Sequence, residues 1–272
     1  MKLLRNAKTL LSNPEIAWNY SSYWVSKLTN SGQAIRVFPD GIKVTGLSGF
    51  SEFHSCSQYV SREEREFLQN YPLGLGDLID IGANLGLITA ILAKQFPERQ
   101  VHAFEPNLST FQSLQANIAI NGLTNVKAQQ CAVGKHNGEV SFMADPIHRA
   151  TCSMATSEAQ DTVSVPCTAL DSYIKKQSIN KIAFLKVDVE GYETLVFQGA
   201  EEMLKRQQVQ LIYYEVCPTL TKKAGFEPEL PTQMLMQNGY QISKLNNQGC
   251  LVPVNLETIH QINLENWIAI PA

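Results

Sequence analysis

The sequence predicts an α/β fold built on a mostly parallel, Rossmann-like sheet, and three observations support this prediction. From residue 77 onward, short apolar runs alternate with longer amphipathic segments, as in parallel sheets that carry helices on both faces. The apolar run 78–81 ends in a glycine turn at Gly82. Glu105 closes the next apolar run, 25 residues after Asp80, about where a βαβ unit places a ribose-binding carboxylate.

Residues 1–70 are expected to form a small N-terminal cap of helical segments and one β-hairpin, followed by a ligand-binding domain at 71–272. Alternating apolar residues flank the turn sequence Pro39-Asp40-Gly41, which predicts a hairpin over 34–45. Ser61 and Glu64 have the spacing of a capping box and predict a short helix. The cap is expected to cover the ligand site.

Four aromatic residues are crowded near the start of this cap, at Trp18, Tyr20, Tyr23 and Trp24. Large aromatic side chains bury much apolar area, so we expect these four to pack against the core. Contact with a substrate is the alternative interpretation.

The elements of the sheet domain follow in order. Short apolar runs bounded by Gly or polar residues predict strands, and longer segments after each run predict helices. Strands are expected at 77–82, 100–105, 126–132, 138–143, 163–167, 183–189, 209–216, 240–245 and 267–271, and helices at 86–96, 108–121, 170–176, 193–207 and 231–238. The last two strands have no helix between them, which indicates an antiparallel hairpin at one edge of the sheet.

The turn after the first strand favours S-adenosylmethionine over a dinucleotide. A dinucleotide turn has glycine where the backbone meets the pyrophosphate, whereas this turn carries Asn84 and follows Asp80. A carboxylate at this place repels a pyrophosphate and attracts an ammonium group. S-adenosylmethionine carries an ammonium group and a ribose diol and has no phosphate. We therefore expect Asp80 and Asn84 to face its amino acid portion, with Gly82 and Gly86 lining the approach.

Two further residues complete the predicted cofactor site. Glu105 is expected to hold both ribose hydroxyls, and Ala132, just after the third strand, is expected to lie near the adenine. A structural alternative is a glycine turn that only packs a helix on a strand.

Five segments resemble the signature motifs of FkbM-type methyltransferases. They are Asp80-Ile-Gly-Ala-Asn-Leu-Gly86, Phe104-Glu-Pro106, Cys131-Ala-Val-Gly134, Thr168-Ala-Leu-Asp171, and Leu185-Lys-Val-Asp-Val-Glu-Gly191 followed by Glu193. The resemblance runs from about Tyr59 to Tyr240, and its last segment is the most family-specific. It implies a class I methyltransferase domain at 71–272 and S-adenosylmethionine-dependent transfer, most often to a hydroxyl of a sugar or secondary metabolite.

Acidic residues follow several predicted strands and are expected to gather along one rim of the sheet, since ligands bind beyond the carboxyl ends of parallel strands. They are Asp80, Glu105, Asp188, Glu190 and Glu215. Asp188 and Glu190 are the predicted catalytic residues, because a hydroxyl acceptor must be aligned and must lose its proton. Alternatively, these two acids only cap the helix that begins after Gly191.

Other functions stay open at this point. An NAD-linked oxidoreductase and a non-catalytic cofactor-binding protein are the alternatives to a methyltransferase. Paired acids could hold Mg²⁺ beside a catechol-like acceptor. His148 could act as a base, although we prefer to interpret its surroundings as a surface loop. The cap and the 145–161 stretch are expected to shape the acceptor pocket.

The bulk composition narrows the classes of partner. A net charge of −3 with no basic stripe argues against nucleic acid as a substrate. The histidines and cysteines form no zinc-binding cluster, so no metal is predicted. The longest apolar run, 85–93, is too short to span a bilayer, and we expect a cytoplasmic enzyme that acts on a small molecule or glycan.

Overall fold

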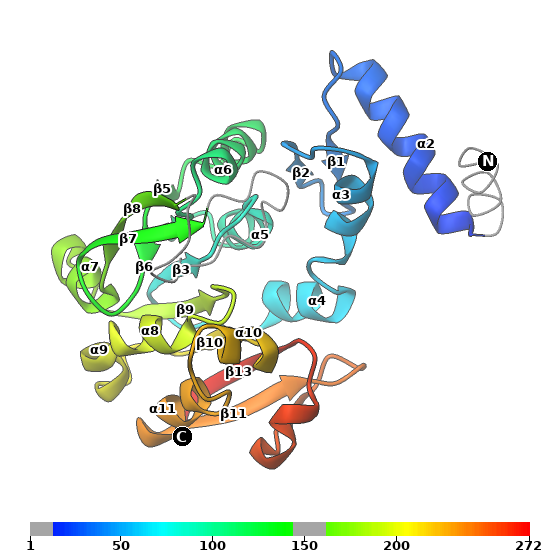
Figure 1. Ribbon diagram of the computed structural model, residues 1–272. Helices are drawn as coiled ribbons and strands as arrows, with labels where there is room; N and C mark the ends of the chain where they lie inside the picture. Colours follow the sequence, from blue (N-terminus) through cyan, green and yellow to red (C-terminus); the bar gives the residue numbers. More distant parts are fainter. Residues whose placement is uncertain (1–12, 144–161) are drawn as a thin grey trace.

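One eight-stranded sheet organises the fold in the computed structural model, which describes residues 13–143 and 162–272 (Figure 1). The strand order across the sheet is β12-β11-β13-β10-β9-β3-β4-β5. In chain order these strands are β3 (Asp77–Ile81), β4 (Val101–Phe104), β5 (Val126–Gln129), β9 (Ile182–Val187), β10 (Ile212–Val216), β11 (Tyr240–Leu245), β12 (Leu251–Pro253) and β13 (Glu265–Pro271).

The five strands from β10 to β5 are parallel to one another, which confirms the predicted fold class. The chain starts at β3 in the middle, moves outward to β4 and β5, and then crosses to β9 and β10 on the other side of β3. The strand order therefore reverses between β3 and β9. Ligands of open α/β sheets bind at such a switch point, outside the carboxyl ends of the strands.

The antiparallel part of the sheet differs in detail from the expected edge hairpin. β11 and β13 do pair antiparallel, but β13 lies between β11 and β10 and is antiparallel to both. The outer edge is β12, a three-residue strand too short to show a period in the sequence. β13 takes an interior place because Trp267 is fully buried against the ring of Tyr214.

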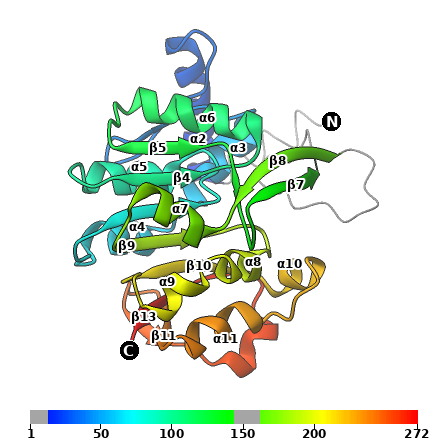
Figure 2. The ribbon, with the colours of Figure 1, turned by 90° about the vertical axis from the view of Figure 1, so that its left-hand side faces the viewer.

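Two layers of helices cover the sheet (Figure 1, Figure 2). The helices after the first strand are α5 (Leu87–Gln95), α6 (Leu108–Ile120), α7 (Leu170–Gln177), α8 (Glu193–Gln198), α9 (Glu201–Lys205), α10 (Pro218–Lys223), α11 (Leu230–Gln237) and the 3-10 helix η3 (Leu256–Gln261). Alternate residues of a strand belong to two different hydrophobic clusters, one on each face of the sheet. Leu78 and Phe184 pack in the cluster that contains α5. Ile79 and Leu185 pack in the cluster that contains α7, α8, α9 and α11. This alternation is the two-residue period of a strand.

Two predicted elements are divided in the structure. The helix expected at 193–207 breaks into α8 and α9 at Gly199, where a Cβ would overlap the carbonyl oxygen of Gly134. The strand expected at 126–132 ends at Gln129. A second sheet of order β6-β8-β7 then follows, formed by β6 (Ala132–Val133), β7 (Gly138–Met143) and β8 (Thr162–Thr168).

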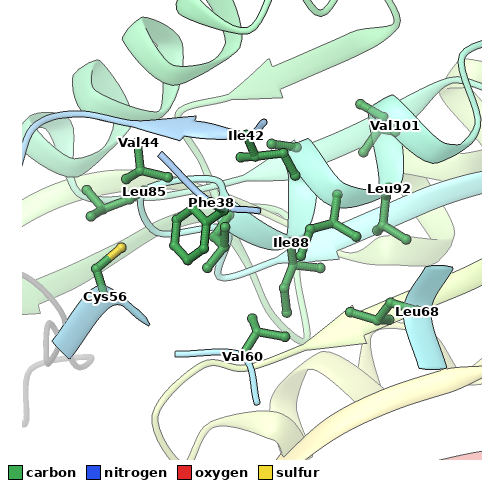
Figure 3. Close-up of a cluster of buried hydrophobic side chains, with 14 of the residues drawn as sticks. Phe38, Ile42, Val44, Cys56, Val60, Leu68, Leu85, Ile88, Leu92 and Val101 are labelled. Carbon is green, nitrogen blue, oxygen red and sulfur yellow. The ribbon is translucent and has the colours of Figure 1, made fainter. Parts of the chain in front are cut away.

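The N-terminal residues pack into the same core as the sheet. Their elements are α2 (Pro14–Thr29), β1 (Arg36–Val37), β2 (Lys43–Val44), α3 (Phe50–Ser55), the 3-10 helix η1 (Cys56–Gln58) and α4 (Arg62–Asn70). β1 and β2 form the predicted hairpin, and Ser61 and Glu64 form the predicted capping box. Figure 3 shows Phe38 and Ile42 of the hairpin region beside Ile88 and Leu92 of α5.

The crowded aromatic residues of α2 divide between core and surface. Tyr23 is buried, but Trp18 and Trp24 are 73% and 47% exposed, so the expectation that all four pack against the core is wrong. α2 lies at the outside of the molecule (Figure 1), where Trp18 and Trp24 are exposed among the described residues. Across the described part of the chain, no helix is long and apolar enough to cross a membrane.

Candidate active site

A cavity of about 400 Å³ lies at the switch point between β3 and β9, and we call it the main cavity. Its wall combines the turn after β3, the ends of β4, β9 and β10, the segment after α3, and the start of β13. The lining residues are Cys56, Gln58, Tyr59, Val60, Gly82, Ala83, Asn84, Leu85, Leu87, Ile88, Glu105, Pro106, Lys186, Asp188, Val189, Glu190, Glu215, Leu264 and Asn266. Part of the N-terminal segment therefore closes one side of the cavity.

The turn after β3 requires glycine because two chain segments meet there. Gly82 has φ +75°, and a Cβ on it would overlap the carbonyl oxygen of Asp188. Asn84 has φ +50°, a left-handed conformation that asparagine tolerates better than most residues. Gly86 has φ +83° and is the N-cap of α5. The turn thus brings backbone close to a ligand at the N-terminal end of α5.

Replacing Gly86 with alanine is expected to lower the free energy of unfolding by about 2–3 kcal/mol, from left-handed strain and local overpacking. The added Cβ would press on the Leu114 side chain, which must move. Gly122→Ala is the matched control, because Gly122 also has positive φ but has open space around its Cβ position. Urea unfolding measures both; equal losses in the two variants would contradict the packing argument.

Glu105 is held at the tip of β4 by two backbone donors. Its Oε2 accepts from the N–H of Asn84 and its Oε1 from the N–H of Asn107, each at 2.9 Å. Burial raises the pKa of Glu105 to about 7, against the opposing effect of these two hydrogen bonds. Each carboxylate oxygen has a second lone pair, so Glu105 can accept two further hydrogen bonds from a diol.

Lys186 is a buried cation beneath the main cavity. Its Nζ lies 3.4 Å from Asp80 Oδ1 and 3.2 Å from Asp188 Oδ2, and donates to the carbonyl oxygen of Gly82 at 2.9 Å. Burial lowers the pKa of Lys186, but Asp188 and Asp80 outweigh burial and raise it above the ordinary value. The lysine therefore stays charged and ties β3 to β9 at the switch point.

Asp80 lies deeper than the sequence predicted. Its residue is fully buried, its Oδ2 accepts from the hydroxyl of Thr89 at 2.5 Å, and it is absent from the cavity wall. The expected direct contact with a ligand's amino acid portion does not fit this position. Any influence of Asp80 on a ligand passes through Lys186, since the two are paired. Asn84, Gly82, Glu105, Asp188 and Glu190 do line the cavity as expected, whereas Gly86, also expected there, is absent from its wall.

Besides Glu105, three acids line the cavity at the ends of β9 and β10: Asp188, Glu190 and Glu215. Burial, then the charges of Asp188 and Glu193, raise the pKa of Glu190 to about 7. Burial, then Asp188 and Glu190, raise the pKa of Glu215 to about 10, and its Oε2 has no hydrogen-bond partner. A cavity wall with several acids and one buried lysine favours a ligand that carries positive charge.

The turn that carries Glu190 has a strained backbone, which hydrogen bonds to Glu193 hold in place. Glu190 has φ +55°, an unfavourable conformation for a residue with a long side chain. Glu193 is buried and its Oε1 accepts from the N–H groups of Val189 and Gly191, both at 3.2 Å. Glu193 thereby holds the backbone on both sides of Glu190 and aims this side chain at the cavity. The sequence alternative, that Asp188 and Glu190 only cap a helix, is not supported, since α8 begins at Glu193 without a side-chain cap.

A family model described as the methyltransferase FkbM domain matches residues 80–242, more than half of the chain. The chain belongs to the FkbM methyltransferase family. This membership favours a methyltransferase over the NAD-linked oxidoreductase that the sequence left open. The match covers the glycine turn, Glu105, Lys186 and the three cavity acids.

Curated relatives of this FkbM-family protein are similar over part of their length. Methyltransferase 1 of Beauveria bassiana is 24% identical, over 46% of this chain and 58% of that protein. Hexuronic acid methyltransferase AglP of Haloferax volcanii is 28% identical, over 62% of this chain and 66% of that protein. The 31-O-demethyl-FK506 methyltransferase FkbM of Streptomyces tacrolimicus is 27% identical, over 54% of this chain and 69% of that protein. The chain thus spans somewhat more than half of these relatives' lengths.

Solved structures with a similar chain path include the METTL16 MTase domain and precorrin-6y C5,15-methyltransferase from Geobacter metallireducens. The first has a TM-score of 0.46 and 12% identity, over 94% of this chain and 91% of that chain. The second has a TM-score of 0.42 and 12% identity, over 78% of this chain and 89% of that chain.

Ala132 borders a second, smaller cavity rather than the main one. This cavity of about 20 Å³ shares Gly82, Pro106 and Val189 with the main cavity and is closed by Tyr192. The predicted contact of Ala132 with an adenine therefore remains a proposal for this family member, supported by the shared wall.

Sequence reasoning assigned no role to several cavity residues. Lys186 had a recognisable signal, because a lysine inside a buried apolar strand requires paired acids. Asn266 and Tyr59 had none, since neither residue belongs to one of the five motif segments. His148 and the 145–161 stretch lie outside the described residues. Among the residues described, no group of three or more His, Cys, Asp or Glu has an arrangement that could hold a metal ion.

Proposed function

We propose that this FkbM-family protein binds S-adenosylmethionine in the main cavity and transfers its methyl group to a hydroxyl. The observation that carries the proposal is the charge of the cavity wall. Glu105, Asp188 and Glu190 bring negative charge to one space, and Lys186, the only cation among its described lining residues, is already paired with the carboxylates of Asp80 and Asp188. S-adenosylmethionine has two cationic groups, its ammonium and its sulfonium, and suits such a wall.

The residues present also suit the remaining parts of this cofactor. Glu105 retains two lone pairs for the ribose hydroxyls, and the turn at Gly82 and Asn84 permits close backbone approach. Ala132, beyond Pro106, is the proposed neighbour of the adenine. Asp188, whose Oδ2 is held by Lys186, is the proposed partner of the ammonium group. When bound, S-adenosylmethionine supplies a methyl group already activated by its positive sulfur.

The chain's own contribution is alignment of the acceptor and removal of its proton. Glu190 is the proposed base: it lines the cavity, its backbone is fixed by Glu193, and its pKa of about 7 suits proton transfer near neutral pH. The acceptor's hydroxyl oxygen bonds to the methyl carbon as the methyl–sulfur bond breaks. The proton of this hydroxyl moves to the Glu190 carboxylate. Glu215, with a pKa of about 10, is protonated and can donate a hydrogen bond to the acceptor.

A hydroxyl on a saccharide or secondary metabolite is the proposed acceptor. The names of two relatives support it: one acts on a hexuronic acid and one on 31-O-demethyl-FK506. Incubation with radiolabelled S-adenosylmethionine and a panel of glycosides and polyketides tests the reaction. Label on protein or nucleic acid alone would refute it, and tight binding of the cofactor without transfer to any acceptor would favour a non-catalytic role.

Glu105→Ala is expected to weaken binding of S-adenosylhomocysteine about 10–100-fold, because charge-assisted hydrogen bonds to the ribose are lost. Calorimetric titration measures this affinity. Glu98→Ala is the matched control, since the Glu98 side chain is 67% exposed and lies outside the main cavity. In the wild type, affinity should rise between pH 6 and 8, because Glu105 with its pKa of about 7 ionises in that range. Unchanged affinity in Glu105→Ala would remove the ribose assignment.

A further inference from the structure

Another cavity, larger than the main cavity and distinct from the small one at Ala132, opens beside the main cavity, and we call it the outer groove. It has a volume of about 770 Å³ and is formed by Val252 and by residues within 58–64, 244–248 and 264–266. These segments are the start of α4, the β11–β12 turn and the start of β13. Four residues line both spaces: Gln58, Tyr59, Leu264 and Asn266. The outer groove is therefore the direct continuation of the main cavity past Asn266.

The shared wall places a polar side chain next to the cavity acids. Asn266 is paired in register with Glu215 across β10 and β13. Its Nδ2 donates to Glu64 Oε1 at 2.7 Å, and the same oxygen accepts from the hydroxyl of Tyr213. Glu64 is itself fixed as the N3 residue of the capping box of α4. Asn266 is thus held in one orientation at the mouth between the two spaces, with its Oδ1 available as an acceptor.

The rest of the groove offers hydrogen-bonding groups of the kind that hydroxyls require. Amide side chains come from Gln58, Asn247 and Gln248, and the half-exposed ring of Tyr59 supplies an apolar face. A volume of this size lies in the ~300–1,000 Å³ range of pockets for ligands larger than a single small ring. Alternating hydroxyls and an apolar ring face are the features of a saccharide.

The charge of the groove restricts which saccharide fits. Among the described residues, three acids line the groove, Glu63, Glu64 and Glu265, and one cation does, Lys244. The Lys244 Nζ is already engaged by both carboxylate oxygens of Glu265, at 2.8 and 3.0 Å. Two negative charges remain without a cationic partner facing the groove. An acidic sugar would meet like charge there, and a neutral one would not.

We propose that the outer groove is the acceptor site and that it selects a neutral, hydroxyl-rich saccharide over a uronate. The inference rests on the proposed methyl transfer, because it places the saccharide in the outer groove and directs its reacting hydroxyl past Asn266 of the shared wall toward Glu190 in the main cavity. It departs from the hexuronic acid that names one relative. The cavity between α2 and the β1–β2 hairpin shares no lining residue with the main cavity and is not continuous with the reacting centre.

The test compares two ligands that differ only at one carbon, methyl β-D-glucoside and methyl β-D-glucuronide. Saturation-transfer NMR gives their affinities for the full chain, with and without S-adenosylhomocysteine. The glucoside is expected to bind about fivefold more tightly than the glucuronide, the size of a partly exposed charge–charge effect. Equal binding, preference for the glucuronide, or no binding of the glucoside would overturn the proposal.

Two pairs of variants locate the binding. Glu63→Gln is expected to narrow the preference for the glucoside about two- to threefold, whereas Glu66→Gln, the same change on the outer face of α4, leaves it unchanged. Gln248→Trp is expected to abolish glucoside binding by filling the groove, and Gln241→Trp, exposed on β11 outside it, is not. Full binding in Gln248→Trp, or an equal effect of Glu63→Gln and Glu66→Gln, would overturn the proposal.

A separate measurement distinguishes this failure from failure of the proposed function. Calorimetry with S-adenosylhomocysteine reports the main cavity alone, and its result should be the same in wild type, Glu63→Gln and Gln248→Trp. Loss of this binding in the wild type would refute the cofactor assignment. If S-adenosylhomocysteine binds normally and the glucoside does not bind, only the proposed acceptor site is refuted.

Discussion

Replacing Lys186 with methionine is expected to lower the free energy of unfolding by about 3–5 kcal/mol, the loss typical of a buried ion pair with one partner removed. Without the lysine Nζ, the fully buried Asp80 carboxyl has no cationic partner, and among the described residues only the Thr89 hydroxyl still donates a hydrogen bond to it. Asp188 also loses its cation. Urea unfolding followed by circular dichroism measures the change.

Lys205→Met is the control for this experiment. The Lys205 side chain is 63% exposed and pairs with Glu201 on the surface of α9. Exposed pairs contribute about 0–1 kcal/mol, so the control should stay near the wild-type stability. Adding Asp80→Asn to Lys186→Met should recover part of the loss, because it removes the uncompensated charge. A Lys186→Met protein as stable as the control would contradict the role given to this lysine.

Glu190→Gln is expected to reduce methyl transfer by about 10²–10⁴-fold, the usual contribution of a positioned base. The amide has nearly the same shape as the carboxylate, so binding of S-adenosylhomocysteine should change little. In the wild type, kcat/KM should rise with pH through about 7, because Glu190 must lose its proton before it can accept one from the acceptor. This rise should disappear in Glu190→Gln.

Glu193→Gln is the control for the base. Burial raises the pKa of Glu193 to about 7 as well, but its carboxylate binds backbone N–H groups and lies outside the cavity wall. The variant should lose less than about tenfold in rate, since an amide oxygen still accepts these hydrogen bonds. Full activity in Glu190→Gln would discard the base and leave Asp188 as the remaining candidate; a full loss in Glu193→Gln would show that backbone position dominates.

The aromatic residues of α2 show that crowding in the sequence does not predict burial. Trp18 and Trp24 are exposed, although their crowding in the sequence suggested a packed cluster. Aromatic content alone does not decide burial, because burial depends on which neighbours the fold brings to each face. Tyr23 is buried against the rings of Phe50 and Phe53, and Tyr20 reaches Phe50 as well but stays partly exposed.

The sequence by itself determined the parallel sheet, the glycine turn and most of the acids at its rim. These features are local: a buried strand is a short apolar run, positive φ favours Gly or Asn, and strand ends meet at one edge of a parallel sheet. Gly82, Glu105, Asp188 and Glu190 therefore line the main cavity as expected. Whether they perform the proposed roles is a matter for the variants above.

The tertiary structure alone decided the depth of Asp80, the identity of the acids that pair with Lys186, and the boundary of the site. The depth of a side chain depends on how far its strand end lies beneath the neighbouring loop, and residue spacing in the sequence does not give this distance. The place of β13 between β10 and β11 brings Asn266 beside Glu215, 51 residues earlier in the sequence. Contacts between such distant segments arise from packing of whole elements, which carries no local sequence period.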